Sequence, residues 1–198
     1  MTDVKDKTAA FVRAALAQRQ PDVLTDPHLK DSAVVLLLYP KEGQYCVLLN
    51  KRSMEVEFNK GEMCFPGGSK DPEDADLWAT ALRETHEEMG IRPEDITILG
   101  ELSETNTGAG FRIHPYVGTI PYPYAFHPSG IEIAAVVEVP INHLLDKRNY
   151  TEEMRMRMGV LTHMTTYTYN DHRIFGATAR ILRQFLDILE QSGWPKEA

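Results

Sequence analysis

The stretch Phe65–Ile91 reads FPGGSKDPEDADLWATALRETHEEMGI and combines a glycine-rich turn, a helix start and three closely spaced glutamates. Asp71 is suited to cap a helix, with an acidic residue three positions later, and Pro72 suits the first helical position. Gly90 is a typical stop signal. These residues predict a helix over 72–89.

One side of this helix is apolar and the adjoining flank is acidic. At about 100° per residue, the apolar side gathers Trp78, Ala81, Leu82, Thr85 and Met89. Glu84, Glu87 and Glu88 share the flank at i,i+3 and i,i+4 spacing, where like charges destabilise a helix. Two interpretations remain open, a solvated acidic face or a site for a hard divalent cation, since oxygen donors suit Mg²⁺ or Mn²⁺.

The rest of the chain alternates apolar strand patterns with amphipathic segments and shows no internal repeat. Expected helices cover 5–19 and 177–191, and expected strands cover 32–39, 45–50, 96–99, 112–120 and 131–139. A proline-containing linker follows the first helix. This mixture predicts an α+β or α/β layered domain with a single core.

Composition excludes several classes of protein. The chain has 198 residues, 42% of them hydrophobic and 25% charged, which is typical of one globular domain. Its 21 Lys and Arg against 29 Asp and Glu leave a net charge of −8, which disfavours nucleic acid and anionic membranes as partners. No apolar run approaches the roughly 20 residues of a membrane helix. Cys46 and Cys64 predict two reduced thiols, and we expect a cytoplasmic protein.

The glutamate helix and the turn before it together form a recognisable pattern. The segment Gly68–Ile91 resembles the signature of the Nudix hydrolases: a glycine, an acidic residue, then Arg-Glu-x-x-Glu-Glu-x-Gly and an apolar residue. Three positions differ from the usual pattern: Asp74 replaces a glutamate, Arg83 follows it by nine residues instead of eight, and Thr85 replaces an aliphatic residue.

The resemblance implies a Nudix fold, which is an α/β/α sandwich with a mixed β-sheet between helices. It implies one Nudix hydrolase domain over 1–198, with an N-terminal helix and linker in 1–30 and the Nudix box in 68–91.

The same resemblance implies a set of catalytic and metal-binding residues. The metal ligands would be Glu84, Glu87, Glu88 and the carbonyl of Gly68, with Mg²⁺ or Mn²⁺ as the cofactor. The catalytic set adds Arg83, expected to pair with Asp74 or to orient a carboxylate, and Glu132. The general base stays open between Glu84 and Glu132, and Glu132 is otherwise an exposed strand residue.

A narrower resemblance covers Leu48–Ser53, Gly61 and Phe65–Gly68, which are similar to the extra motif of the coenzyme A diphosphatase branch. Asn50 stands where that branch has threonine, and Glu57 stands where it has an arginine. An anion at position 57 would repel the phosphates of coenzyme A.

Four residues are expected to contact the substrate, and each has an alternative interpretation. They are Lys51, Arg52, Arg112 and Gly67. Basic residues near strand ends are also common as plain solubilising residues, and the Gly67–Gly68 pair would also suit a simple tight turn.

The expected reaction is cleavage of coenzyme A or its derivatives into 3′,5′-ADP and a 4′-phosphopantetheine species. The alternatives are a Nudix diphosphatase acting on ADP-ribose, NADH or another nucleoside diphosphate derivative, and a non-catalytic nucleotide sensor on the same fold. Bound metal would reverse the local charge, so an acidic protein can still take an anionic diphosphate. A homodimer is left open.

Overall fold

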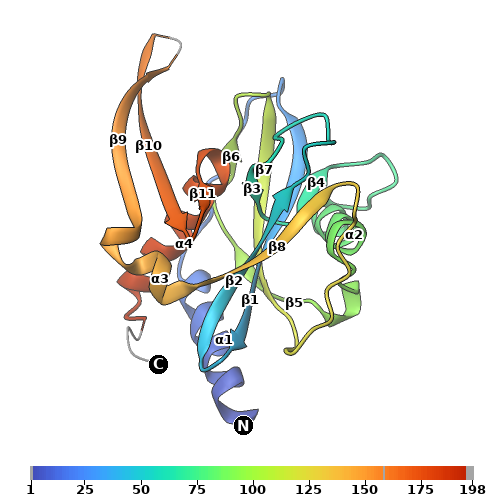
Figure 1. The fold of residues 1–198 in the computed structure, drawn as a ribbon, viewed down its shortest axis with the longest axis vertical. Helices are drawn as coiled ribbons and strands as arrows, with labels where there is room; N and C mark the ends of the chain where they lie inside the picture. Colours follow the sequence, from blue (N-terminus) through green and yellow to red (C-terminus); the bar gives the residue numbers. More distant parts are fainter. Residues whose placement is uncertain (1, 158, 195–198) are drawn as a thin grey trace.

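The computed structural model describes residues 2–157 and 159–194. Within them, a mixed eight-stranded sheet forms the centre of the molecule (Figure 1). Its main path is β3-β2-β1-β7-β5, with β4 beside β1, β6 beside β7 and β8 beside β2. The strands are β1 (Lys30–Lys41), β2 (Gln44–Arg52), β3 (Met63–Cys64), β4 (Gly67–Ser69), β5 (Thr97–Glu101), β6 (Thr105–Asn106), β7 (Phe111–Thr119) and β8 (Ile133–Pro140).

Strands β1 and β7 pair in parallel, and the other neighbours in this sheet pair antiparallel. Helices lie on both faces of the sheet, so the predicted α+β Nudix sandwich with a mixed sheet is confirmed. The α-helices are α1 (Thr2–Ala17), α2 (Leu77–Met89), α3 (Ile141–Leu145) and α4 (Gly176–Gln191), and two 3₁₀ turns cover Pro93–Asp95 and Lys147–Asn149.

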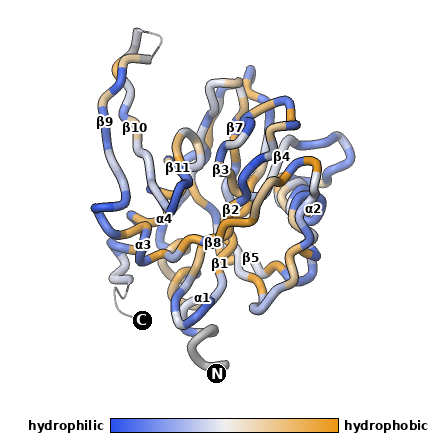
Figure 2. Tube along the Cα trace, in the orientation of Figure 1, coloured by the Kyte–Doolittle hydropathy of each residue, from blue (hydrophilic) through white to orange (hydrophobic). Residues whose placement is uncertain are grey.

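The apolar run of β1 explains the two layers. Successive side chains of a strand point to opposite faces, and both sets are apolar in β1, as expected for a buried central strand. Val35 and Leu37 pack with α2, whereas Leu36 and Leu38 pack with α1 and α4. The hydropathy trace shows this continuous apolar centre in β1, β2 and β8 (Figure 2).

A second, three-stranded antiparallel sheet lies beside this body in the order β11-β10-β9. It consists of β9 (Tyr150–Arg157), β10 (Val160–Tyr169) and β11 (His172–Ile174). The sequence patterns did not predict it, because charged and polar residues occupy both faces of the β9–β10 hairpin.

Helix α2 begins five residues later than predicted. Its N-cap is Asp76, whose side chain accepts a hydrogen bond of 2.8 Å from the backbone N–H of Ala79. Asp71 and Asp74 form a separate turn, because the backbone N–H of Asp71 donates to the Asp74 carboxylate at 2.9 Å. The helix ends at Gly90 as predicted, in the left-handed conformation with φ of 68°.

Other sequence expectations are confirmed with small shifts at the ends of elements. The expected strand over 131–139 begins at Ile133, so Glu132 lies in the turn before β8. Both cysteines are free thiols, and Cys46 is buried. In the part of the chain that the structure describes, no helix is long and apolar enough to cross a membrane.

Candidate active site

Glu88 is the most buried carboxylate of α2, with only 2% of its side chain exposed. Its Oε2 accepts hydrogen bonds from Asn50 Nδ2 at 2.9 Å and from the Gly67 backbone N–H at 3.2 Å, and its Oε1 accepts one from Arg52 Nη1 at 3.0 Å. Burial raises the pKa of Glu88 to about 7, even though the contacts to Gly67 and Arg52 act in the opposite direction. Three hydrogen bonds therefore hold the Glu88 carboxylate in one buried position at the centre of the site.

Glu84 lies one turn earlier and packs directly against the glycine loop. A Cβ atom on Gly68 would lie 2.4 Å from the Glu84 carboxyl carbon, so any larger residue at Gly68 would displace this side chain. Burial raises the pKa of Glu84, and the negative charges of Glu87 and Glu132 add to that effect against the opposing contact with Arg83. A partly buried carboxylate with raised pKa is a common feature of functional sites.

Arg83 connects the helix to the loop before it. Its Nε and Nη2 donate to the two carboxylate oxygens of Asp74 at 3.0 and 2.9 Å, which is a bidentate pairing. Pairing with Asp74 was one of the two roles expected of Arg83. Its Nη1 donates to Glu84 at 3.0 Å and to Glu87 at 3.1 Å. Arg83 thus lies between carboxylates and orients them, and its contact with Asp74 holds the pKa of that carboxyl well below the usual range.

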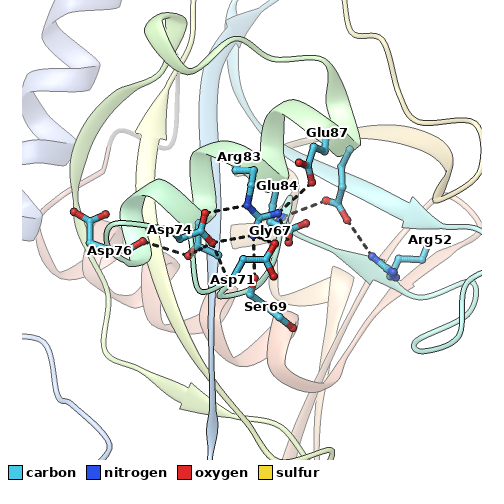
Figure 3. Close-up of polar contacts among 11 residues, drawn as sticks. Arg52, Gly67, Ser69, Asp71, Asp74, Asp76, Arg83, Glu84 and Glu87 are labelled. Atoms are coloured by element: carbon cyan, nitrogen blue, oxygen red, sulfur yellow. Dashed lines mark hydrogen bonds and ion pairs between the residues drawn. The ribbon is translucent and has the colours of Figure 1, made fainter.

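Two arginines approach this set of glutamates from opposite sides, Arg83 with Asp74 on one side and Arg52 on the other (Figure 3). Glu87 lies nearest the solvent, with 57% of its side chain exposed, against 18% for Glu84. The three glutamates that the sequence placed on one flank therefore differ strongly in burial.

Glu132 joins this group from another part of the chain. The backbone N–H of Ser53 donates to the Glu132 carbonyl at 2.7 Å, and the N–H of Ser129 donates to the Glu88 carbonyl at 2.9 Å. These two bonds fix the turn before β8 against the ends of β2 and α2. They place Glu132 beside the cluster, with its side chain exposed. Its negative charge adds to the effect of burial in raising the pKa of Glu84 and Glu88.

The structure does not bring all predicted substrate contacts to the carboxylates. Lys51 alternates along β2 with Asn50 and Arg52, which both reach Glu88, so Lys51 points to the opposite face of the sheet. The guanidinium of Arg112 donates to Asp31 and to a backbone carbonyl. The guanidinium of Arg112 is therefore paired with Asp31 and does not face the glutamates.

Arg52 and Gly67 do lie at the site, but their observed partner is Glu88. Arg52 Nη1 binds that carboxylate, while its buried Nε has no hydrogen-bond partner. Gly67 has φ of 144°, and a Cβ there would lie 2.2 Å from the Ala33 carbonyl oxygen, so only glycine fits. Gly67 therefore turns the loop and orients Glu88.

Asn50 is a site residue that the motif comparison treated only as a departure. Its side chain is fully buried, and Nδ2 donates to Glu88 while Oδ1 has no hydrogen-bond partner. The signal was available in the sequence, because Asn50 is a polar residue inside the apolar run of β2. A buried amide in a strand normally needs a specific partner.

The chemistry of these donors fits a hard divalent cation. Carboxylate oxygens and the Gly68 carbonyl are oxygen ligands of the kind that Mg²⁺ and Mn²⁺ prefer. Burial raises the pKa of both Glu84 and Glu88, so a nearby cation would favour their charged forms. Across residues 2–157 and 159–194, however, no three His, Cys, Asp or Glu side chains already form a metal site. Arg83 holds Glu84 and Glu87 in the present arrangement, so binding of an ion requires these side chains to turn.

A family model described as the NUDIX domain matches residues 29–173. A protein of Photorhabdus laumondii named uncharacterised Nudix hydrolase NudL is 35% identical over 152 residues, covering 77% of this chain and 81% of the relative. A protein of the same name from Enterobacter sp. strain 638 is 35% identical over 165 residues, covering 83% and 86%.

A solved structure shows the same fold over most of the chain. The MutT/nudix family protein of Enterococcus faecalis superposes with a TM-score of 0.58 at 17% identity, covering 92% of this chain and 69% of that protein. At this identity the likeness concerns the fold alone.

Proposed function

The chain belongs to the Nudix family and is a Nudix hydrolase, and we propose that it cleaves the diphosphate bond of coenzyme A or its derivatives. The products would be 3′,5′-ADP and a 4′-phosphopantetheine species. The observation that carries this proposal is the convergence of Arg52 and Gly67 on Glu88. Both residues match the stretch that resembles the coenzyme A diphosphatase motif.

Glu84, Glu87, Glu88 and the Gly68 carbonyl would hold Mg²⁺ or Mn²⁺. When bound, such an ion neutralises the diphosphate and makes a water molecule a better nucleophile. Arg83 keeps Glu84 and Glu87 oriented, and Arg52 with Asn50 keeps Glu88 oriented. Glu84 and Glu132 are the two candidates for taking the proton of the attacking water.

A second candidate substrate is ADP-ribose, NADH or another nucleoside diphosphate derivative, and Glu57 favours it. Glu57 is exposed in the loop between β2 and β3, where the coenzyme A branch has an arginine. A carboxylate there repels the additional phosphate that distinguishes coenzyme A from these compounds.

Product analysis distinguishes the two substrates. The purified protein is incubated with coenzyme A, ADP-ribose and NADH in Mg²⁺ and in Mn²⁺, and the products are separated by anion-exchange chromatography. We expect 3′,5′-ADP from coenzyme A, and Glu57→Arg should lower the KM for coenzyme A more than the KM for ADP-ribose. Intact coenzyme A alongside hydrolysed ADP-ribose would support the second candidate, and binding without hydrolysis of any substrate would support a sensor.

The carboxylate assignment has its own test. Because a positioned general base contributes about 100-fold or more to a rate, we expect Glu84→Gln to lower kcat by at least that factor and to weaken Mn²⁺ binding measured by calorimetry. Glu73→Gln is the matched control, because Glu73 is an exposed carboxylate in the turn before α2. Equal activity and Mn²⁺ affinity in the two variants would contradict the assignment.

We also propose that residues 1–198 act as one hydrolase domain in the cytoplasm. Val12 and Leu16 of α1 share one hydrophobic core with Leu182 and Phe185 of α4, on the face of the sheet opposite α2. The two free thiols agree with a reducing compartment.

A further inference from the structure

The β9–β10 hairpin is the feature that the catalytic site does not use. It extends from the body of the molecule next to α4 (Figure 1). Strand β9 has β10 on one side, and the structure, as far as it is described, places no strand on the other. A free strand edge presents unpaired N–H and C=O groups, which are a template for pairing with another chain.

One face of the hairpin carries exposed apolar side chains among the polar residues Glu152, His163 and Thr165. Near the body, Tyr167 on this face is fully buried in the core. Farther out, the same face carries Met154, Met156 and Leu161, whose exposed fractions are 55%, 70% and 57%. Three large apolar side chains exposed together on one face are typical of an interaction surface.

We propose that the free edge of β9 binds a second copy of the chain, by antiparallel pairing of β9 with β9 about a two-fold axis at Met154. In this register Glu153 of each copy lies opposite Arg155 of the other, so the interface contains two opposite-charge pairs. Opposite charges directly across a strand pair are stabilising, and like charges are destabilising. Strand β9 is therefore complementary to itself.

The charges select this register over its neighbours. A two-fold axis normal to the sheet pairs residues that lie on the same face of the two strands. Moving the axis by one residue along β9 therefore gives the next possible register. Shifting the centre to Glu153 places two glutamates opposite each other, and shifting it to Arg155 places two arginines opposite each other. The Met154-centred register avoids both.

The proposed pairing also extends the apolar surface. The two-fold axis keeps the same face of both hairpins on one side, so Met154 and Met156 of the two copies form one continuous patch. A single strand edge buries less area than a typical stable interface. We therefore expect a concentration-dependent dimer instead of an obligate one.

Sedimentation velocity of the full chain over a range of concentrations tests the proposal. We expect a dimer whose dissociation constant rises by about tenfold or more in Arg155→Glu, because two attractive cross-strand pairs become repulsive. The double variant Glu153→Arg with Arg155→Glu should restore the dimer, since it exchanges the charges and keeps them complementary. Arg173→Glu, at an exposed position of β11 in the same sheet, is the matched control and should leave the dimer unchanged.

Cross-linking tests the register independently of charge. Met154 faces its own copy across the axis, whereas Met156 faces Glu152, and opposite Cβ atoms in an antiparallel pair lie about 4.5 to 5.5 Å apart. Under mild oxidation, Met154→Cys should form a covalent dimer and Met156→Cys should not. A chain that stays monomeric at every concentration overturns the proposal. A dimer that Arg155→Glu leaves unchanged, or that cross-links equally at both positions, overturns it as well.

Discussion

Two glutamate–arginine pairs in this molecule have similar geometry and very different surroundings. Glu88 and Arg52 at the candidate active site are 3.0 Å apart, with 2% and 20% of their side chains exposed. Glu153 and Arg155 on the hairpin are 2.7 Å apart, with 50% and 58% exposed. The shorter contact belongs to the exposed pair, yet water screens it, so burial and not distance decides how much each pair contributes.

The difference shows how one type of residue serves two purposes. At the candidate active site, burial makes each charge depend on its partners, which holds the carboxylates in place. On the hairpin, the same residue types stay solvated, and the weak ion pair between them can be exchanged for pairs with another surface. Four substitutions test this contrast, and their expected effects on stability decrease in the order in which they follow.

The largest effect is expected at Gly67, in the loop before α2. Gly67→Ala would place a Cβ 2.2 Å from the Ala33 carbonyl oxygen and 2.6 Å from the Val34 Cα, at φ of 144°. We expect a loss of about 4 kcal/mol in the free energy of unfolding, because backbone cannot move away cheaply. Chemical denaturation gives this value.

Gly159→Ala, at the tip of the hairpin, is the matched control. Gly159 also has positive φ, at 81°, but its Cβ would meet nothing within 4 Å. The remaining cost is that of placing a residue with a Cβ in the left-handed conformation, about 1 kcal/mol. Equal losses for the two variants would mean that the Gly67 loop is not constrained as described.

Arg52→Met should be the next most damaging change. It leaves Glu88 buried without its cation, which costs about 3 kcal/mol at pH 8. Because the pKa of Glu88 is raised to about 7, the carboxyl is mostly neutral near pH 5.5, and the loss should be smaller there. Urea unfolding in the presence of a chelator at both pH values measures it.

The control for Arg52→Met is the double variant with Glu88→Gln. Removing the negative charge should recover much of the lost stability, since the penalty comes from the unpaired carboxylate. If the double variant is as unstable as Arg52→Met alone, packing of the Arg52 side chain and not charge explains the effect.

A smaller, pH-dependent effect is expected at Asp74. Arg83 holds the pKa of Asp74 below its ordinary value of 3.8, so ionised Asp74 stabilises the folded chain above that pH. This contribution is lost as the pH falls through the lowered pKa. Asp74→Asn should therefore cost about 1 to 2 kcal/mol near neutral pH and less in acid, and thermal unfolding as a function of pH provides the comparison. A constant difference at all pH values would contradict it.

The smallest effect is expected on the hairpin itself. Arg155→Met should change the free energy of unfolding of the monomer by no more than about 0.5 kcal/mol, because exposed ion pairs contribute little. Denaturation at a concentration below the dimerisation range isolates the monomer. A loss as large as that of Arg52→Met would remove the distinction between the two pairs.

Local sequence signals predicted the longer helices and strands of the body with errors of a few residues, but not the short elements β3, β4, β6 and α3. The start of α2 was wrong because Asp71 and Asp76 are both good caps, and Asp74 is engaged by Arg83 and Thr80 outside the helix. The β9–β10 hairpin was missed because its strands carry charges and methionines without a regular apolar pattern. Such strands are specified by their partner strand and not by their own sequence.

The candidate site divides in the same way. Glu84, Glu87, Glu88 and Arg83 follow from helical spacing and from the resemblance of one continuous segment. The sequence did not predict that Lys51 points away from the site. This orientation follows from the structure, in which Asn50 and Arg52 face Glu88. The ion pair between Arg112 and Asp31 depends on the pairing of β1 with β7, which are far apart in the chain.

The sequence by itself determined the family, the acidic flank of α2 and the glycines before it, because these depend on neighbours within one stretch of chain. Only the tertiary structure decided which glutamate is buried and which is exposed, and how Glu132 reaches the site. Burial and the resulting pKa shifts arise from the packing of β2, the glycine loop and the turn before β8 around α2. Those contacts join residues far apart in the chain, so a local sequence pattern does not predict them.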